Sequence, residues 1–301
     1  MSARRLAELR CRIKTDPVYV EHSQDTSYLC IFRLSSIEPA DYVRAIQEPH
    51  MLKVRILRWD RARKMNVVCP SFQEVWDNSL LFQELFLRAR DPQEEKWRLQ
   101  KRYGYKLATN FMPMYARELF GYFRAKCVLD PCAGWGDRLA GALSSECTES
   151  YVGFDPNVDL MAGYKRIVTE FSERDEKRFT VHPMRFERSA EVLSGYELFD
   201  FAFTGPPFFD YEHYGEYMPI YGNWIEEFYV PLFKITHDHL RAGSFFAVYL
   251  NDTSAGAIER FMLEEVPEFT TFAFRGKIGL IGGSSGTVRD VFVFQKESGR
   301  V

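Results

Sequence analysis

Short apolar runs alternate with longer amphipathic stretches from about Cys127 onward, and no other feature constrains the fold of this chain as strongly. Such alternation is typical of a mostly parallel sheet with helices on both faces. The sequence predicts strands of that sheet near Cys127–Asp130, Tyr151–Phe154, Phe179–His182, Phe199–Thr204 and Ser244–Leu250. It predicts helices between them near Arg138–Leu143, Asp159–Phe171, Ala190–Leu193 and Trp224–His239.

Two further apolar runs, Phe269–Phe274 and Val288–Gln295, follow a predicted helix around Ala257–Glu264. We expect them to pair as antiparallel strands that close the sheet, with the glycine- and serine-rich loop Gly279–Thr287 between them. The predicted fold class is therefore α/β.

The first hundred residues have a different texture. Apolar runs predict strands at Tyr28–Leu34 and Leu52–Arg58. Helical spacing predicts a helix over Ser71–Arg90, and Ser71 with Glu74 three residues later forms a capping box at its start. We therefore expect two domains. Residues 1–100 form a smaller α+β region, which is a candidate for substrate recognition, and residues 101–301 form the α/β domain.

Charge and cysteine content exclude several classes of protein. The 39 basic and 42 acidic residues give a net charge of −3, so only a local patch could bind nucleic acid. The six cysteines form no Cys-x-x-Cys pair, which argues against a zinc site and against a disulfide scaffold. No window approaches about 18 uninterrupted apolar residues, and Met1–Cys11 lacks the apolar run of a signal peptide. The sequence predicts a soluble protein of the cytoplasm or nucleus that does not bind membranes.

Two glycines follow the first predicted strand of the α/β domain. Gly134 and Gly136 would let the backbone turn tightly and approach a ligand at the carboxyl edge of the sheet, where open α/β sheets bind nucleotide-like molecules. The next strand is followed by Asp155, and an acidic side chain there can accept hydrogen bonds from both hydroxyls of a ribose. A nicotinamide dinucleotide fingerprint needs a third glycine, but Leu139 stands at that position.

An acidic residue that opens the loop, a short glycine pair and then a ribose acid resemble the S-adenosylmethionine (SAM) site of class I methyltransferases. The segment 108–116, with its Phe-Met-Pro sequence, is similar to the stretch that closes over the methionine end of the cofactor in amino-methyltransferases. The resemblance implies SAM as the cofactor, bound by Asn110, Phe111, Pro113, Asp130, Pro131, Ala133, Gly134, Gly136, Asp155 and Glu187. The alternative is an ordinary strand-to-helix turn with an N-capping Asp.

The strand Phe199–Thr204 runs into the sequence Gly-Pro-Pro-Phe at residues 205–208. Two prolines fix the backbone and remove two amide donors, so the turn presents rigid carbonyls to which a planar amino group can bind. This turn resembles the Asp/Asn/Ser-Pro-Pro-Tyr/Phe motif of amino-methyltransferases that modify adenine N6 or cytosine N4, and the resemblance covers roughly residues 105–296.

That resemblance implies a Rossmann-like class I methyltransferase with a mostly parallel seven-stranded sheet and a terminal antiparallel strand. It implies methylation of an exocyclic amine, adenine N6 before cytosine N4, with the catalytic residues Gly205, Pro206, Pro207 and Phe208. Carbonyl acceptors such as that of Pro206 would favour the pyramidal, attacking form of the amine, and Phe208 would stack on the base. The partner would be DNA or RNA with an unpaired or flipped base.

Position 205 departs from the motif, because its first residue normally contributes a side-chain acceptor. Thr204, Asp210 or a backbone carbonyl are candidate replacements. The alternatives are a weak site or a catalytically silent partner subunit with the same fold. A protein amide or guanine N2 is an alternative substrate, since a related Pro-Pro-Tyr turn serves planar amines there.

Two segments are candidates for binding the substrate. The aromatic and acidic loop Phe209–Trp224 contributes Phe209, Asp210 and Tyr211, and its carboxylates lack metal-ligand spacing, so no metal is expected. The basic cluster over residues 53–64 contributes Arg55, Arg58 and Trp59, whose charges and ring suit phosphate contacts and stacking. The alternative is a solvated basic face. The oligomeric state is not determined by the sequence.

Overall fold

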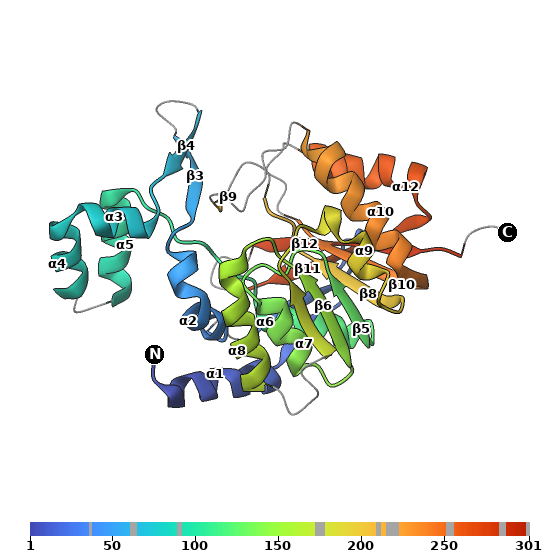
Figure 1. The fold of residues 1–301 in the computed structure, drawn as a ribbon, viewed down its shortest axis with the longest axis horizontal. Helices are drawn as coiled ribbons and strands as arrows, with labels where there is room; N and C mark the ends of the chain where they lie inside the picture. The colour runs from blue at the N-terminus through green and yellow to red at the C-terminus, as the bar shows by residue number, and fades with distance from the viewer. Residues whose placement is uncertain are drawn as a thin grey trace. The chain divides into compact units, whose positions relative to one another are not determined.

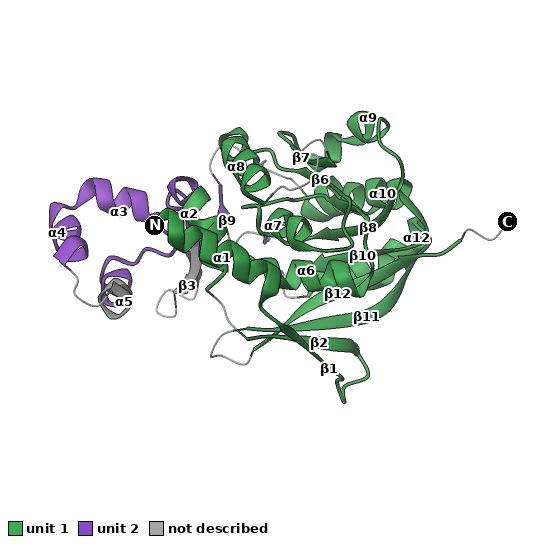
Figure 2. Ribbon diagram, turned by 90° about the horizontal axis from the view of Figure 1, so that it is seen from below, with its two compact units in different colours: residues 1–46, 110–207, 220–301 green, residues 47–109, 208–219 purple. Residues whose placement is uncertain are grey.

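The computed structural model describes residues 1–35, 38–60, 65–88, 92–171, 178–208, 212–214, 223–250, 256–282 and 287–298. The chain forms two compact units, the larger from residues 1–46, 110–207 and 220–301 and the smaller from residues 47–109 and 208–219 (Figure 2). This division does not follow the boundary expected at residue 100. The reason is that the first 46 residues contribute a helix and two strands to the larger unit.

A nine-stranded sheet lies at the centre of the larger unit (Figure 1). In spatial order its strands are β1 (Val18–Glu21), β2 (Tyr28–Leu34), β11 (Phe272–Ile281), β12 (Val288–Lys296), β10 (Leu240–Tyr249), β8 (Phe199–Thr204), β5 (Cys127–Asp130), β6 (Ser150–Phe154) and β7 (Phe179–His182).

The directions of the strands confirm the predicted fold class. Strands β10, β8, β5, β6 and β7 run parallel, whereas β12 is antiparallel to both of its neighbours, β10 and β11. The sheet is therefore mostly parallel and Rossmann-like, with an antiparallel closing strand. The sheet has two strands more than the seven predicted, because β1 and β2 extend it beyond β11.

Helices cover both faces of the sheet. Two successive residues of β10 show this, since successive residues of a strand point to opposite faces. Phe245 of β10 contacts Phe123, which follows α6 (Pro113–Tyr122), at a ring-centroid distance of 5.0 Å. The next residue, Phe246, contacts Phe233 of α10 (Val230–His239) at 5.2 Å.

Each face carries a connected group of helices. On one face, α7 (Asp137–Ser144) packs against α6, α1 (Ala3–Thr15) and α8 (Met161–Phe171). The 3₁₀ turn η1 (Val158–Leu160) precedes α8. On the other face, α10 packs against the 3₁₀ turn η3 (Phe186–Arg188), the π-helical turn η5 (Ile225–Tyr229) and the short helix α12 (Val266–Phe269). The π-helical turn η6 (Phe261–Glu265) packs against α12 and α11 (Ala257–Arg260), and α9 (Ala190–Leu193) packs against η3.

Helices α6 and α7 cross closely at a glycine. A Cβ on Gly141 would lie 2.6 Å from Cβ of Ala116 and 2.7 Å from the Pro113 carbonyl oxygen, so no larger residue fits. On α6, Arg117 donates hydrogen bonds of 2.6 Å to the carbonyls of Ile13 and Asp16 at the end of α1. These bonds satisfy carbonyls that a helix end leaves unpaired, and they fix α1 against α6.

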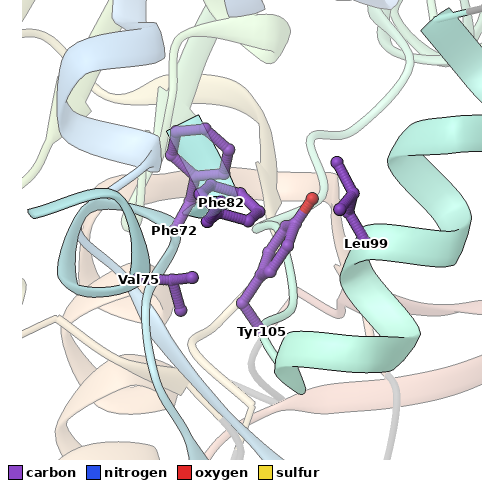
Figure 3. Packing of buried hydrophobic residues seen from close by; sticks show 5 residues of the cluster. All are labelled: Phe72, Val75, Phe82, Leu99 and Tyr105. Atoms are coloured by element: carbon purple, nitrogen blue, oxygen red, sulfur yellow. The ribbon is translucent and has the colours of Figure 1, made fainter. Parts of the chain in front are cut away.

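The smaller unit has its own sheet and core. Strand β3 (Arg55–Asp60) pairs with β4 (Met65–Cys69) and with β9 (Glu212–His213). Three helices, α3 (Phe72–Asn78), α4 (Leu80–Arg88) and α5 (Pro92–Tyr103), accompany them, and α2 (Ala40–Met51) spans the boundary between the units along the chain. Figure 3 shows the core cluster of Phe72, Val75, Phe82, Leu99 and Tyr105.

The predicted capping box at Ser71 is confirmed. Its hydroxyl accepts the Glu74 amide at 3.2 Å, and the Glu74 carboxylate accepts the Ser71 amide at 2.8 Å. The helix predicted over Ser71–Arg90 is divided at Ser79, because the Ser79 hydroxyl accepts the Phe82 amide at 3.1 Å and begins a second helix. The strand predicted from Leu52 begins only at Arg55.

The lengths of the helices and the state of the cysteines bear on the class of protein expected from the sequence. Within the ranges given above, no helix has the length and apolar character needed to cross a membrane. All six cysteines lie in those ranges, and none forms a disulfide.

Candidate functional site

The predicted site residues follow the carboxyl ends of parallel strands. Strand β5 ends at Asp130 and β8 at Thr204, and parallel neighbours bring these ends to one edge of the sheet. The ring of Phe111, just before α6, lies at the same edge, 5.6 Å from Phe203 and 5.2 Å from Tyr249 at the end of β10. The pre-loop segment therefore contacts the strand that leads into the Pro-Pro turn.

The loop between β5 and α7 turns through two glycines with positive φ angles, +61° at Gly134 and +100° at Gly136. A Cβ on Gly136 would lie 2.8 Å from Cδ1 of Ile167 in α8, so this glycine is needed for close packing. Around Gly134, by contrast, no described atom would lie nearer than 3.9 Å to an added Cβ. The backbone at Gly134 is therefore open to close approach by a ligand.

Asp130 is fully buried, and its carboxylate is bound by three groups of the protein. It accepts hydrogen bonds from Nε of Arg138 at 2.7 Å, from the Tyr151 hydroxyl at 2.6 Å and from the Cys132 amide at 3.2 Å. Arg138 also donates to the Cys132 carbonyl. A buried charge pair is favourable only with such complete hydrogen bonding, and this pair holds the shape of the loop.

Asp155, the predicted ribose acid, is half-buried at the end of β6. Its Oδ1 accepts the Asn157 amide at 2.8 Å, and its own amide donates to the His182 carbonyl at 3.1 Å. Burial raises the pKa of Asp155 to about 7, although hydrogen bonds from Asn157 and Gly134 oppose that rise. Asp155 thus changes charge near neutral pH.

Asn110 joins the pre-loop segment to two other elements. Its Nδ2 donates to Oδ1 of Asp137 at 2.9 Å and to the Ala40 carbonyl at 2.7 Å, while its Oδ1 accepts Arg44 at 3.3 Å. Asp137 is 3% exposed, and burial raises its pKa to about 7. The side chain of Asn110 therefore fastens α2 to the start of α7.

The predicted catalytic turn leaves β8 at Gly205. A Cβ at this position would lie 3.0 Å from Nη1 of Arg138 and 3.4 Å from the Tyr249 ring. Pro206 is buried and Pro207 is half-buried. The turn and the glycine loop therefore adjoin at the Arg138 guanidinium, which is bonded to the loop.

The remaining predicted cofactor residues all belong to the larger unit. Pro113 opens α6 and is buried, Pro131 and Ala133 are buried in the loop, and Glu187 is half-buried in η3.

The predicted substrate residues are less fully described. Phe208 belongs to the smaller unit, and Phe209, Asp210 and Tyr211 lie outside the described residues. The backbone of Arg58 and Trp59 forms part of β3, and their side chains are outside the description.

Arg55 is paired within the smaller unit. Its Nε donates to the Glu74 carboxylate at 3.0 Å, and the arginine holds the pKa of Glu74 down at about 2. Part of its charge is therefore already compensated.

Sequence reasoning missed four residues of this arrangement, namely Arg44, Asp137, Arg138 and Tyr151. Asp137 and Arg138 are adjacent residues of opposite charge in a helix whose first seven residues are all buried. Two charged residues at the start of an otherwise apolar helix were the available signal. Arg44 and Tyr151 have no local signal, because their partners are 66 and 21 residues away along the chain.

No protein-family profile and no curated protein sequence matches this chain. Solved structures similar to it include a methyltransferase from Pyrococcus furiosus, with a TM-score of 0.44 and 18% identity, covering 62% of this chain and 83% of that one. An rRNA methylase from Streptococcus thermophilus has a TM-score of 0.44 and 11% identity, with coverages of 64% and 100%. The O-methyltransferase TomG from Streptomyces achromogenes, solved with SAM, has a TM-score of 0.45 and 13% identity, with coverages of 75% and 99%. The likeness is one of fold and brings no substrate or residue role to this chain.

Proposed function

We propose that the protein is a SAM-dependent methyltransferase that modifies an exocyclic amino group of a nucleic-acid base, adenine N6 in preference to cytosine N4. The observation that carries the proposal is the junction of the glycine loop with the Pro-Pro turn at Arg138. This arginine is bonded to Asp130 and Cys132 in the loop, and its Nη1 lies 3.0 Å from the position of a Cβ at Gly205. The glycine loop, as the cofactor-binding end of the site, and the Pro-Pro turn, as its catalytic end, would meet at Arg138.

The residues at the cofactor end fit SAM. Gly134 leaves room for a ligand against the backbone, and the ionised carboxylate of Asp155 can accept hydrogen bonds from the ribose hydroxyls. The side chains of Asn110 and Asp130 form hydrogen bonds with other residues of the protein. We therefore assign them the role of holding the pre-loop segment and the loop in place. When bound, SAM supplies a methyl group on a sulfonium, whose transfer needs in-line placement and no metal.

The residues at the chemical end act on the amine. Pro206 and Pro207 have no amide N–H, so they add no competing donor to the turn, and we assign the carbonyls of Gly205 and Pro206 as acceptors for the amine. Acceptors on the amine hydrogens favour the pyramidal nitrogen, whose lone pair can attack the methyl group. We propose that Phe208 stacks on the base, a contact worth about 1–3 kcal/mol.

Transfer of a labelled methyl group from SAM to single-stranded DNA, duplex DNA and RNA pools, followed by nucleoside mass spectrometry, tests this function. We expect a labelled N6-methyladenine or N4-methylcytosine product. Asp155→Ala should lose SAM affinity and transfer together. Asp159→Ala is the matched control, because Asp159 is an exposed acid four residues further along the same loop and short helix.

The negative outcomes of this experiment differ from one another. SAM binding without label in any nucleic-acid pool would contradict the substrate and turn attention to a protein amide. A chain that does not bind SAM would be a silent partner with a methyltransferase fold. Label on guanine N2 would keep the enzyme class and replace the base.

A further inference from the structure

Arg289 lies at the edge of the sheet that carries the candidate site. Strand β12 is antiparallel to β10, so its first residues adjoin the last residues of β10, with Val291 opposite Tyr249. Nη1 of Arg289 donates a hydrogen bond of 3.0 Å to the Tyr249 hydroxyl. The arginine is otherwise exposed, so it is a cation anchored at one point with solvent around it.

Tyr249 connects this arginine to the chemical end of the site. Its Cδ1 lies 3.4 Å from the position of a Cβ at Gly205, and its ring lies 5.2 Å from that of Phe111. One rigid aromatic side chain therefore borders the Pro-Pro turn and also holds Arg289. A ligand whose planar group binds at the turn would extend past Tyr249 toward the guanidinium.

The charge of Arg289 is not compensated by the described part of the chain. None of the ion pairs among those residues includes Arg289. The adjacent acid, Asp290, is bound on the other side of the strand by Lys277 at 3.1 Å and by the Tyr28 hydroxyl at 2.7 Å. An exposed, singly anchored and unneutralised guanidinium is suited to an anionic ligand, and above all to the paired oxygens of a phosphate.

A buried donor next to this position also lacks an acceptor. Tyr115 is 5% exposed, and its hydroxyl has no hydrogen-bond partner among the described residues. That hydroxyl faces Gly282, where a Cβ would lie 3.0 Å away, just beyond Leu280, the register partner of Arg289. A buried donor without a partner destabilises a fold, so this edge of the sheet carries a local cost in free energy.

We propose that Arg289, positioned by Tyr249, binds a backbone phosphate of the nucleic-acid substrate beside the methylated base. The inference rests on the proposed function and adds a residue that positions the substrate strand. The cofactor carboxylate is the other anion that a guanidinium here could bind. The strand order favours the phosphate, because β12 lies on one side of β8 and the cofactor strands β5 and β6 lie on the other.

The test is binding of a fluorescent single-stranded oligonucleotide to Arg289→Gln, measured by anisotropy over a range of salt concentrations with SAM present. Loss of one phosphate contact should weaken binding about tenfold at low salt and reduce the slope of log K against log salt by about 0.7. Arg241→Gln is the matched control, because Arg241 is an exposed arginine at the opposite end of β10. It should bind like the wild type.

A set of oligonucleotides, each with one phosphate replaced by a neutral methylphosphonate, identifies the contact. At one linkage near the target base the replacement should weaken binding to the wild type and not to Arg289→Gln. SAM affinity, measured by calorimetry, should be equal in the two proteins.

Three results would overturn the inference or its basis. An unchanged salt slope in Arg289→Gln, or no linkage that couples to this residue, would remove the phosphate contact while leaving the proposed function intact. A weaker affinity for SAM in Arg289→Gln would assign the arginine to the cofactor carboxylate. A wild-type protein that binds no oligonucleotide would remove both the inference and the nucleic-acid substrate.

Discussion

At the scale of single residues, Arg138 explains why position 205 carries no side chain. Its guanidinium is fixed by Asp130 and by the Cys132 carbonyl, and Nη1 lies 3.0 Å from the place of a Cβ at Gly205. A carboxylate, amide or hydroxyl at position 205 would start beside a buried cation and would pair with it. Such a group would be engaged by the protein and lost to the substrate amine, so we assign the acceptor role to backbone carbonyls.

This assignment predicts the result of restoring a side-chain acceptor. In Gly205→Asn the amide should bind Arg138 and displace the turn, so kcat for methyl transfer should fall about tenfold. Gly195→Asn is the control, because Gly195 is exposed and its Cβ would meet only the Val192 carbonyl at 3.4 Å. Steady-state kinetics on an oligonucleotide substrate decide the matter. A rise in kcat in Gly205→Asn would show that the missing side chain, and not the carbonyls, is the limiting acceptor.

The raised pKa of Asp155 predicts how the affinity for SAM depends on pH. Its pKa of about 7 means that the carboxylate is mostly protonated at pH 6 and mostly ionised at pH 8. Because we propose that the ionised form accepts both ribose hydroxyls, SAM should bind about tenfold more weakly at pH 6 than at pH 8. Titration calorimetry at both pH values measures this difference. Asp155→Asn should bind weakly at both values, and a wild-type affinity independent of pH would exclude Asp155 as the ribose acceptor.

At the scale of elements, the sequence predicted strands better than it predicted their partners. Strands β5, β7 and β8 have the predicted bounds, because each is a short buried run next to a clear turn signal. The strand Tyr28–Leu34 was also found, but its place beside β11 depends on a long-range pairing that no local pattern reports. The nine-stranded sheet could therefore not be derived from the chain's periodicity.

The strand β11 shows why glycine was misleading. The sequence predicts that Gly279 begins a loop, yet β11 continues to Ile281. A Cβ on Gly279 would lie 2.8 Å from Cγ1 of Val288, so the glycine is there to let two strands approach. At Gly276, with φ +129°, the register with β12 shifts by one residue in a bulge. Both glycines serve tertiary contacts, which outweigh their low strand propensity.

The candidate site was predictable in part for the same reason. Glycines and prolines constrain the backbone in a way that the sequence itself shows, so the tight loop at Gly134 could be predicted, and the role of the turn at Pro206 stays a prediction. The charged groups that shape the site act through partners far along the chain, as Tyr151 does on Asp130. Residue type and spacing do not encode such partners.

Substitutions of the two loop glycines should have different effects, one on the stability of the fold and the other on cofactor binding. Gly136→Ala places a Cβ against Ile167 at a φ of +100°, which should destabilise the fold by about 2–4 kcal/mol. Gly134→Ala meets no close atom and adopts a left-handed conformation that costs an alanine about 1 kcal/mol, but its methyl group occupies the open side of the loop. Urea unfolding and SAM titration measure the two effects. We expect Gly136→Ala to lose mainly stability and Gly134→Ala mainly SAM affinity; equal losses of stability would contradict this division.

At the scale of the whole molecule, the placement of charge matters more than its sum. The net charge is only −3, yet three arginines of the larger unit bond to residues of the candidate site or to its neighbour Tyr249. Arg138 is neutralised by Asp130, Arg44 acts through Asn110 on Asp137, and Arg289 faces outward. Burial raises the pKa of Asp137 to about 7 in the folded state although Asn110, Arg138 and Arg44 oppose that rise, and this links a local network to global stability.

The sign of that linkage can be tested with Asp137→Asn. The folded pKa of Asp137 is raised above its unfolded value, so its contribution to stability is present below about pH 4 and is lost as pH rises through about 7. Asparagine is nearly isosteric, keeps an acceptor for Asn110 and has no charge to bury. The melting temperature of Asp137→Asn should therefore exceed that of the wild type modestly at pH 5 and by a larger margin at pH 8. The surface acids Glu21 and Glu38, whose pKa values are lowered by arginines, act in the opposite direction in both proteins and cancel in the difference. A difference that stays constant from pH 5 to pH 8 would mean that Asp137 is already ionised at pH 5 in the folded protein.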